Sequence, residues 1–185
     1  MRIVKCALLT LLVLFCFGGV AFAEDALIVH GKDFAFKVTE PSGWEGITND
    51  ANRYRVNVYF RMPGYDFNSS PALMYIRVLA KNGLTVSQHI QADMDAFSQK
   101  KKRIAFEAFD ISNLKYEHAS RKYIINDNQI DFLCYIDPGE KWNNYVILAL
   151  TAPRDLAEKN CDVFISLVRS FLWVRAIEHK SVNQQ

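Results

Sequence analysis

The fold class is decided by the segment Val146-Ile147-Leu148-Ala149-Leu150-Thr151, because the strand that it predicts is apolar on both faces. A strand of this kind lies in the middle of a sheet and is covered on both sides. Three strand-like segments precede it, and the polar residues 126–129 and 138–144 are typical of hairpin turns. Since strands joined by hairpins pair antiparallel, we expect a mainly antiparallel sheet. The three segments are residues 104–111, 118–125 and 130–137.

Helical periodicity follows this run of strands and also precedes it. After Pro153, the sequence Asp155-Leu156-Ala157-Glu158 is a capping box, in which two side chains satisfy free backbone N–H groups at the start of a helix. A second capping box, Thr85-Val86-Ser87-Gln88, predicts a helix that ends near residues 100–103. Its apolar face is Val86, Ile90, Met94 and Phe97, and that of the later helix is Cys161, Phe164, Ile165, Val168, Phe171 and Leu172.

The N-terminal half of the chain contains three more strand-like segments. The first, residues 26–40, is interrupted near Gly31-Lys32-Asp33 and ends at the turn Pro41-Ser42-Gly43-Trp44. The second, residues 54–62, alternates apolar and polar side chains, as a half-buried strand does. The third is residues 73–79.

The order of these elements is strands, a helix, four strands and a helix. This order predicts the α+β class, a mainly antiparallel β-sheet with helices packed on it. No repeat, low-complexity tract or Pro/Gly linker divides the chain. We therefore expect one domain over residues 24–177, followed by a flexible tail over residues 178–185.

The first 23 residues have the pattern of a cleavable secretory signal peptide. A short positive segment, residues 1–5, precedes the apolar residues 6–20, and Ala21-Phe22-Ala23 is a typical cleavage site. The apolar run of about 15 residues is shorter than the ~20 that a membrane-spanning helix needs, which favours cleavage. The alternative is that the segment stays uncleaved as a membrane anchor. Cys16 follows the bulky Phe15, which argues against a lipoprotein. The protein is expected to be periplasmic or secreted after cleavage near Ala23.

Cleavage would leave a neutral domain with two cysteines. Removing residues 1–23 removes Arg2 and Lys5 but no acid, so the formal net charge falls from +2 to 0. A neutral domain has no overall field that attracts nucleic acid, and export makes nucleic acid a poorer partner still. Cys134 and Cys161 lie on predicted apolar faces, so they form a candidate disulfide in an oxidising envelope. Two buried free thiols are the alternative.

Several of these features resemble the PsbP-like family, which comprises extrinsic subunits of photosystem II and bacterial envelope proteins of the DcrB type. The resemblance covers residues 27–173 and rests on the order of the elements rather than on a chemical motif. It implies an α/β/α sandwich and a role in assembling or stabilising a membrane-associated complex, and it carries no ligand residues over to this chain. The features are Phe34-Ala35-Phe36-Lys37-Val38, Pro41-Ser42-Gly43-Trp44, the strands up to Leu79, the helix from Thr85, and the last helix up to Leu172-Trp173.

The sequence carries no motif for catalysis or for phosphate binding. It lacks the G-x-S-x-G nucleophile turn, the P-loop and G-x-G-x-x-G. Its histidines are scattered singly, without H-x-H or H-E-x-x-H. The best metal candidate is His89 with Asp93 and the nearby Asp95, and a solvated helix face is the simpler interpretation. We therefore expect no catalytic residues, no metal and no cofactor.

Four aromatic residues in or beside predicted loops are the candidates for binding: Trp44, Tyr65, Phe67 and Trp142. Aromatic side chains are enriched at protein interfaces, and the alternative is that they fold back over the sheet. Trp142 is expected to be the most exposed, because polar residues flank it. A cationic cluster is a candidate for peripheral contact with anionic lipid, although cations also suit a helix C-terminus. The cluster is Lys100, Lys101, Lys102 and Arg103.

The leading hypothesis is an exported, non-enzymatic envelope protein that binds another envelope protein through loops at one end of the sheet. The alternative is a carrier of a small molecule or lipid, with a pocket between sheet and helix. A hydrolase whose site leaves no motif is a third hypothesis. Exposed loop aromatics, polar groups inside an apolar cavity, and a cleft of clustered titratable groups would distinguish the three. The sequence leaves the partner and the oligomeric state open.

Overall fold

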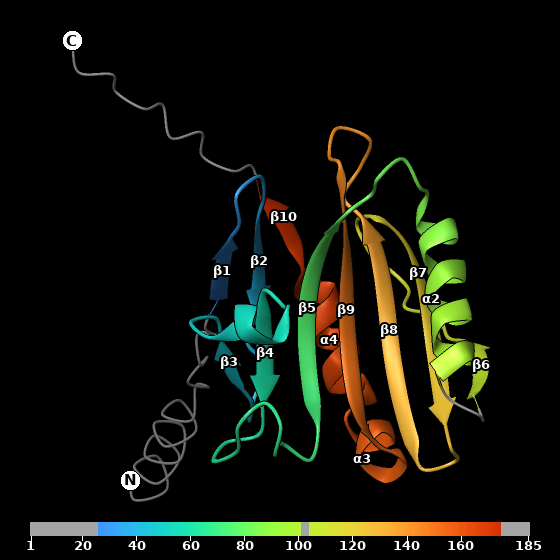
Figure 1. Ribbon diagram of the computed structural model, residues 1–185. Coiled ribbons are helices and arrows are strands. Elements are labelled where there is room, and N and C mark those ends of the chain that lie inside the picture. The colour runs from blue at the N-terminus through green and yellow to red at the C-terminus, as the bar shows by residue number, and fades with distance from the viewer. Residues whose placement is uncertain (1–25, 101–103, 175–185) are drawn as a thin grey trace, which may run out of the picture.

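Strands dominate the protein, whose computed structural model describes residues 26–100 and 104–174 (Figure 1). The predicted signal peptide, residues 1–23, and the predicted tail, residues 178–185, lie outside the described residues. The cationic cluster consists of Lys100, Lys101, Lys102 and Arg103. It also lies outside the described residues, except that the backbone of Lys100 is described.

The larger of two sheets has seven strands, and all of its neighbouring strands pair antiparallel. Their spatial order is β3-β4-β5-β9-β8-β7-β6. The middle strand is β9, and both of its faces are buried, which confirms the central position predicted from residues 146–151. The strands are β3 (Glu45–Ile47), β4 (Val58–Arg61), β5 (Leu73–Ala80), β6 (Ile104–Ala108), β7 (Glu117–Ile125), β8 (Gln129–Asp137) and β9 (Asn144–Pro153).

A smaller antiparallel sheet has the order β1-β2-β10. Its strands β1 (Ala26–His30) and β2 (Ala35–Thr39) are the two halves of the first predicted strand. Its third strand, β10 (Leu172–Val174), corrects the prediction that the last helix continues to Leu172. The helix ends at Ser170, and Leu172 pairs with Lys37 of β2. Pairing with β2 satisfies the backbone of these residues, so a distant partner overrides the local periodicity.

Helices cover both faces of the larger sheet, which gives an α/β/α arrangement (Figure 1). On one face, α2 (Val86–Lys100) packs over β7 and β8. On the other face, α3 (Arg154–Lys159) and α4 (Cys161–Ser170) pack over β8 and β9, and α4 also contacts β2 of the smaller sheet. The predicted α+β class, a mainly antiparallel sheet with helices packed on it, is confirmed.

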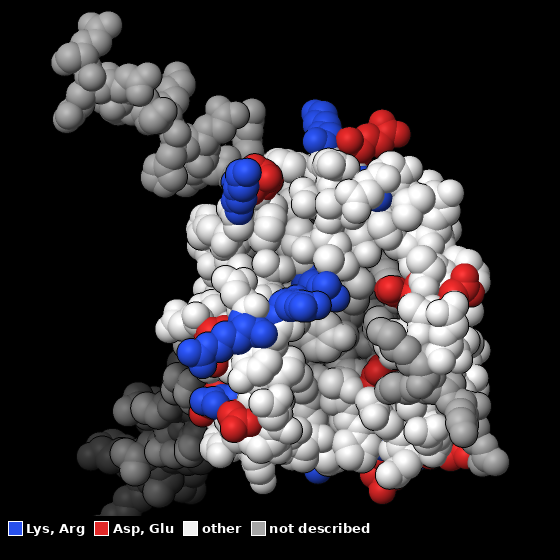
Figure 2. All heavy atoms as spheres, viewed as in Figure 1, with Lys and Arg blue, Asp and Glu red and all other residues white. Residues whose placement is uncertain are grey.

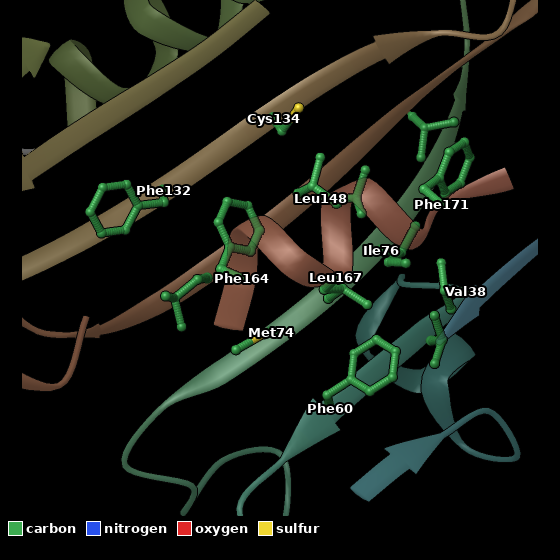
Figure 3. Close-up of a cluster of buried hydrophobic side chains, with 14 of the residues drawn as sticks. Val38, Phe60, Met74, Ile76, Phe132, Cys134, Leu148, Phe164, Leu167 and Phe171 are labelled. Carbon is green, nitrogen blue, oxygen red and sulfur yellow. The ribbon is translucent and has the colours of Figure 1, made fainter. Parts of the chain in front are cut away.

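The main core lies between the larger sheet, α4 and the smaller sheet. Because side chains alternate along a strand, β9 sends Leu148 into this core and Ile147 to the side of α2. Figure 3 shows Phe164 and Leu167 of α4 among side chains from β5, β8 and β9. Each fully buried Leu or Phe stabilises the fold by roughly 1.5–3 kcal/mol.

The two predicted capping boxes have different outcomes. The first is formed: the Thr85 N–H donates to Gln88 Oε1 at 2.8 Å, and the Gln88 N–H donates to Thr85 Oγ1 at 3.3 Å. The second is not formed, because Pro153 occupies the N-cap position and no side chain caps the helix. Asp155 consequently lies inside the first turn of α3, where its charge still suits the helix dipole.

Residues 54–57 do not belong to β4, although the alternation predicted a strand from Tyr54. The 3-10 helix η1 (Ala51–Tyr54) ends at Arg55, whose φ of 59° lies in the left-handed region. The Asn57 N–H then donates to the Ile76 carbonyl of β5 at 2.9 Å. A turn of helix therefore leads into a shorter β4.

Cys134 and Cys161 are free thiols, so the candidate disulfide is not formed. Cys134 is buried in β8 opposite Ser120 of β7, and burial raises the pKa of its thiol to about 12. Cys161 is half-buried in the first turn of α4, and burial together with Asp162 raises the pKa of its thiol. Both pack against the main core as small hydrophobic residues, which was the alternative interpretation.

Candidate functional site

Two of the four loop aromatics fold back onto the core. Trp44 is only 6% exposed, and its backbone N–H donates to the Pro41 carbonyl at 3.0 Å in the predicted turn. Trp142 is half-buried, and its indole packs edge-on against Trp173 with ring centroids 5.5 Å apart. The expectation that Trp142 is the most exposed of the four is therefore wrong.

The other two, Tyr65 and Phe67, lie together in the loop between β4 and β5. Tyr65 is 45% exposed. Phe67 stacks face to face on Tyr54 of η1, with ring centroids 3.8 Å apart and planes 4° apart. It also meets Tyr59 of β4 edge-on at 5.1 Å. Such pairs contribute roughly 0.5–1.5 kcal/mol beyond the burial of area, so the rings fasten the loop to η1 and β4.

Hydrogen bonds inside this loop hold its backbone. Asp66 Oδ1 accepts from the Asn68 N–H at 2.9 Å, the Ser69 N–H at 2.8 Å and the Ser69 hydroxyl at 2.8 Å. These bonds, with the Ser69 hydroxyl first, lower the pKa of the Asp66 carboxyl. The Ser70 N–H also donates to the Asp66 carbonyl at 3.0 Å. The loop that carries Tyr65 is therefore ordered without a partner.

The base of the ring cluster is fixed by one polar contact. The Tyr59 hydroxyl donates to Asp50 Oδ1 at 3.0 Å. Burial and this hydrogen bond raise the pKa of Tyr59 to about 12. Tyr59 therefore remains a neutral donor at physiological pH, and it ties β4 to the residue that precedes η1.

Arginines are frequent in the segments that carry these rings: Arg53 and Arg55 flank Tyr54 in the chain, Arg61 lies in β4 and Arg77 in β5. Arg53 and Arg55 are exposed and Arg77 is half-buried, and none of the three forms an ion pair with another described residue. Arg61, in contrast, pairs with Glu45 at 3.1 Å. Figure 2 shows Lys and Arg side chains gathered over η1, β4 and β5 on one face of the molecule. Arginine and tyrosine are both enriched among the residues that carry binding energy at protein interfaces.

Arg55 occupies a backbone conformation that costs energy. Among the described residues other than glycine, it is the only one with a positive φ that is neither Asn nor Asp. Glycine or asparagine would adopt this conformation more easily. A strained backbone is a reason to look for function at that position. We call Arg53, Tyr54, Arg55, Tyr65 and Phe67 the aromatic–arginine surface.

An open hollow of about 320 Å³ adjoins this surface at Phe67. Its polar part is held by Gln129, whose Nε2 donates to Asp131 Oδ1 at 2.8 Å and to Thr151 Oγ1 at 3.0 Å. The hollow has the size of a site for one side chain of a partner. Its apolar walls are Phe67, Pro71, Leu73, Ala152 and Pro153.

His89 and Asp93, the metal candidate, make separate contacts on α2. His89 stacks on Tyr145 with ring centroids 3.9 Å apart, and its Nε2 lies 3.0 Å from the Lys81 carbonyl oxygen. Asp93 Oδ2 accepts a hydrogen bond from the Tyr135 hydroxyl at 3.0 Å. Burial and the charge of Asp93 raise the pKa of Tyr135. Within residues 26–100 and 104–174, no group of three or more His, Cys, Asp or Glu side chains is arranged to hold a metal.

A groove of about 230 Å³ lies between the end of β2 and α4. The two hydroxyl groups that α4 contributes are engaged in the helix: Ser166 donates to the Asp162 carbonyl at 2.9 Å, and Ser170 donates to the Leu167 carbonyl at 2.7 Å. Ser170 Oγ also accepts from the Thr39 N–H at 3.0 Å. The helix side of the groove therefore offers few free polar groups to a ligand.

No helix among the described residues is long and apolar enough to cross a membrane.

No protein-family model matches the chain, and no curated protein matches its sequence. Several solved structures have a similar course of the backbone, among them a cyanobacterial and a yeast protein. One is the cyanobacterial PsbP (CyanoP) from Synechocystis sp. PCC 6803, with a TM-score of 0.49, 16% identity, and coverage of 84% of this chain and 96% of that chain. The other is the Ran-binding protein Mog1p from Saccharomyces cerevisiae, with a TM-score of 0.49, 9% identity, and coverage of 80% and 94%.

These likenesses are of fold alone. The resemblance to the PsbP-like family, including its DcrB type, stays a prediction.

Proposed function

We propose that this protein is an exported, non-enzymatic module of the cell envelope that stabilises a complex by binding another protein. The binding site is the aromatic–arginine surface with the hollow beside Phe67. The observation that carries the proposal is the fixed presentation of Tyr65, which is 45% exposed on a loop held by Asp66 and by the Phe67–Tyr54 stack.

A loop that is ordered in advance favours binding. Association costs roughly 0.5–1.5 kcal/mol for each flexible side chain that becomes ordered, and a loop fixed by its own hydrogen bonds avoids much of that cost. Tyrosine and arginine are also the residues that most often carry binding energy at protein interfaces. Arg53 and Arg55 can make their hydrogen bonds to a partner, because no described residue pairs with them.

Four of the buried titratable groups are poorly suited to catalysis near neutral pH. The phenols of Tyr75, Tyr123 and Tyr135 have raised pKa values, chiefly through burial, so they stay protonated and do not serve as bases near neutral pH. The thiol of Cys134 has a pKa of about 12 and is buried, so it is a poor nucleophile.

The carrier hypothesis has less support. The hypothesis places the pocket between sheet and helix, and the groove there, between β2 and α4, has a volume of about 230 Å³, below the roughly 300–1,000 Å³ of typical ligand pockets. The open hollow beside Phe67, with about 320 Å³, only reaches the lower end of that range and is lined by loops and strands. In the groove between β2 and α4, the hydroxyl groups of Ser166 and Ser170 already donate to the backbone of α4. A ligand there would have to compete with those bonds.

The proposed location rests on the N-terminal sequence. Residues 1–23 combine a positive start, an apolar run and the Ala21-Phe22-Ala23 site, which favours export. The partner is then an envelope protein. The cationic residues near the end of α2 add a proposed peripheral contact with anionic lipid, with Lys100 and Arg103 as the ends of the cluster.

Quantitative co-purification from the native host tests the binding site. Tagged wild type is compared with the double variant Arg53→Glu/Tyr65→Ala, after checking by circular dichroism that the variant is folded. Leu84→Ala is the control, because Leu84 is 40% exposed but belongs to the turn before α2. We expect one protein to be recovered with wild type and control and to fall at least about 30-fold with the double variant, since interface anchors contribute about 2 kcal/mol. Equal recovery in all three would contradict the proposal.

A further inference from the structure

The four edge strands of the two sheets are protected to different degrees. An edge strand exposes unpaired backbone groups, and proteins usually protect it by shortness, charge or proline. β3 and β10 have only three residues each, and β6 carries Glu107, which pairs with Lys122 at 3.4 Å. β1 has five residues and contains no Lys, Arg, Asp, Glu or Pro. It lies at the outside of the smaller sheet (Figure 1).

The free edge of β1 carries a defined set of backbone groups. The Gly31 N–H donates to the Phe34 carbonyl at 2.9 Å and closes the β1–β2 hairpin. In an antiparallel ladder, every second residue of a strand points its N–H and C=O to the same neighbour. Leu27 and Val29 therefore bond to β2, and the backbone groups of Ala26, Ile28 and His30 point away from it.

The middle of this edge also exposes a large apolar side chain. Ile28 is 59% exposed, more than any other large hydrophobic side chain among the described residues. Its partner across the hairpin is Lys37, on the outer face of the smaller sheet. Leu27 and Val29 point the other way, toward the main core.

We propose that two copies of this protein pair antiparallel through β1, with Ile28 on the two-fold axis. Ile28 then exchanges both backbone hydrogen bonds with Ile28 of the second copy, and Ala26 exchanges its bonds with His30 of the second copy. All of the free groups of the edge are satisfied, and the two Ile28 side chains cover each other. The two small sheets become one sheet that runs through both molecules.

A second copy fits this edge better than a charged or polar strand. Ile28 has an aliphatic neighbour on each side, so antiparallel self-pairing sets Leu27 opposite Val29 on the core face. It also sets no like charges opposite each other, which would be destabilising. Two five-residue strands bury far less than the roughly 1,200–2,000 Å² of a stable interface, so the dimer is weak and depends on concentration.

Sedimentation of the purified protein over a range of concentrations tests the dimer. Wild type is expected to shift from monomer to dimer as the concentration rises. Ile28→Lys places two like charges on the axis, and we expect it to raise the dissociation constant at least about tenfold. Leu84→Lys, a charge at another exposed apolar residue, is expected to leave it unchanged. Wild type that stays monomeric up to its solubility limit would overturn the proposal. The proposal would also be wrong if the β1 edge bound a strand of another protein and no second copy.

Cysteine cross-linking tests the register. In a background with Cys6, Cys16 and Cys161 changed to serine, Ile28→Cys sets two thiols at paired positions, with Cα atoms about 5.5 Å apart. We expect a disulfide-linked dimer under mild oxidation. Lys37→Cys lies on the same outer face but one strand inward, so its two thiols would be about three strand spacings apart and stay unlinked. Equal linking at positions 28 and 37 would contradict this register.

The dimer and the proposed binding of a partner protein can be tested independently of each other. The aromatic–arginine surface is built on η1 and the larger sheet, whereas β1 belongs to the smaller sheet. Tyr65→Ala is therefore expected to leave the dimer intact, and Ile28→Lys to leave the co-purified partner in place.

Discussion

Phe67 lies flat against Tyr54, with ring centroids 3.8 Å apart and planes 4° apart. This contact joins the loop between β4 and β5 to η1. In the chain, the left-handed Arg55 and the strand β4 separate these two segments. Tyr65, two residues before Phe67, extends from the same loop. One of the two aromatic residues therefore holds the loop, and the other is presented by it.

Alanine substitutions should separate these two roles. Phe67→Ala removes both ring contacts, so we expect the free energy of unfolding to fall by about 1–3 kcal/mol, less than for a fully buried Phe. Tyr65→Ala should change it by less than about 0.5 kcal/mol, as exposed substitutions do. Both variants should weaken partner binding. Urea unfolding of the two variants measures the difference, and equal losses of stability would refute the division of roles.

The order of the loop should depend on the charge of Asp66. The hydrogen bonds to Asp66 hold the pKa of its carboxyl below its ordinary value of about 3.9. Because the pKa is lowered in the folded state, the contribution is present above about pH 4 and is lost as the pH falls through the lowered pKa. Asp66→Ala should reproduce that loss at neutral pH. Amide hydrogen exchange at Asn68 and Ser69 should become faster in the variant, and unchanged exchange would show that the loop is held otherwise.

The two capping boxes offer a matched pair of substitutions. Thr85→Ala removes an observed cap of α2 and should cost about 0.5–2 kcal/mol of stability. Asp155→Ala removes no capping bond and should cost less than about 0.5 kcal/mol, because only its favourable interaction with the helix dipole is lost. Thermal or urea unfolding measures both. A larger loss for Asp155→Ala than for Thr85→Ala would mean that α3 is capped in solution by its predicted box.

The local elements were predictable because their signals are local. The strand over residues 146–151 and the helix from Thr85 follow from apolar periodicity and from a capping pattern within a few residues. β10 was not predictable in the same way, because Leu172 pairs with Lys37, which is distant in the chain. Its apolar spacing continues that of α4, so only the presence of β2 determines that the chain turns into a strand.

The candidate site was predicted in part. Tyr65 and Phe67 were found because aromatic residues in a polar loop stand out. For the same reason, the exposure of the Trp142 side chain was overestimated. Its polar neighbours do not reveal that the hairpin brings its ring to Trp173. The arginines were missed because the alternation over residues 54–62 reads as a strand, and only the positive φ of Arg55 shows the turn. The sequence Arg53-Tyr54-Arg55, two cations around an aromatic residue, was the available signal.

Reducing agents should not change the stability of the folded protein. A disulfide between Cys134 and Cys161 would contribute roughly 3–4 kcal/mol, enough to shift the melting temperature by several degrees. Since both thiols are free, we expect the same melting temperature with and without dithiothreitol. A drop of several degrees in its presence would show that the two cysteines are linked after export.

Site-specific photo-cross-linking in the living host tests the central claim, that the aromatic–arginine surface binds an envelope protein. A photoreactive phenylalanine analogue is placed at position 65 and, as the control, at position 84, where Leu84 is also exposed. We expect one protein adduct from position 65, lost when Arg53→Glu is added, and no such adduct from position 84. The same adducts from both positions, or an adduct at position 65 that survives Arg53→Glu, would contradict it.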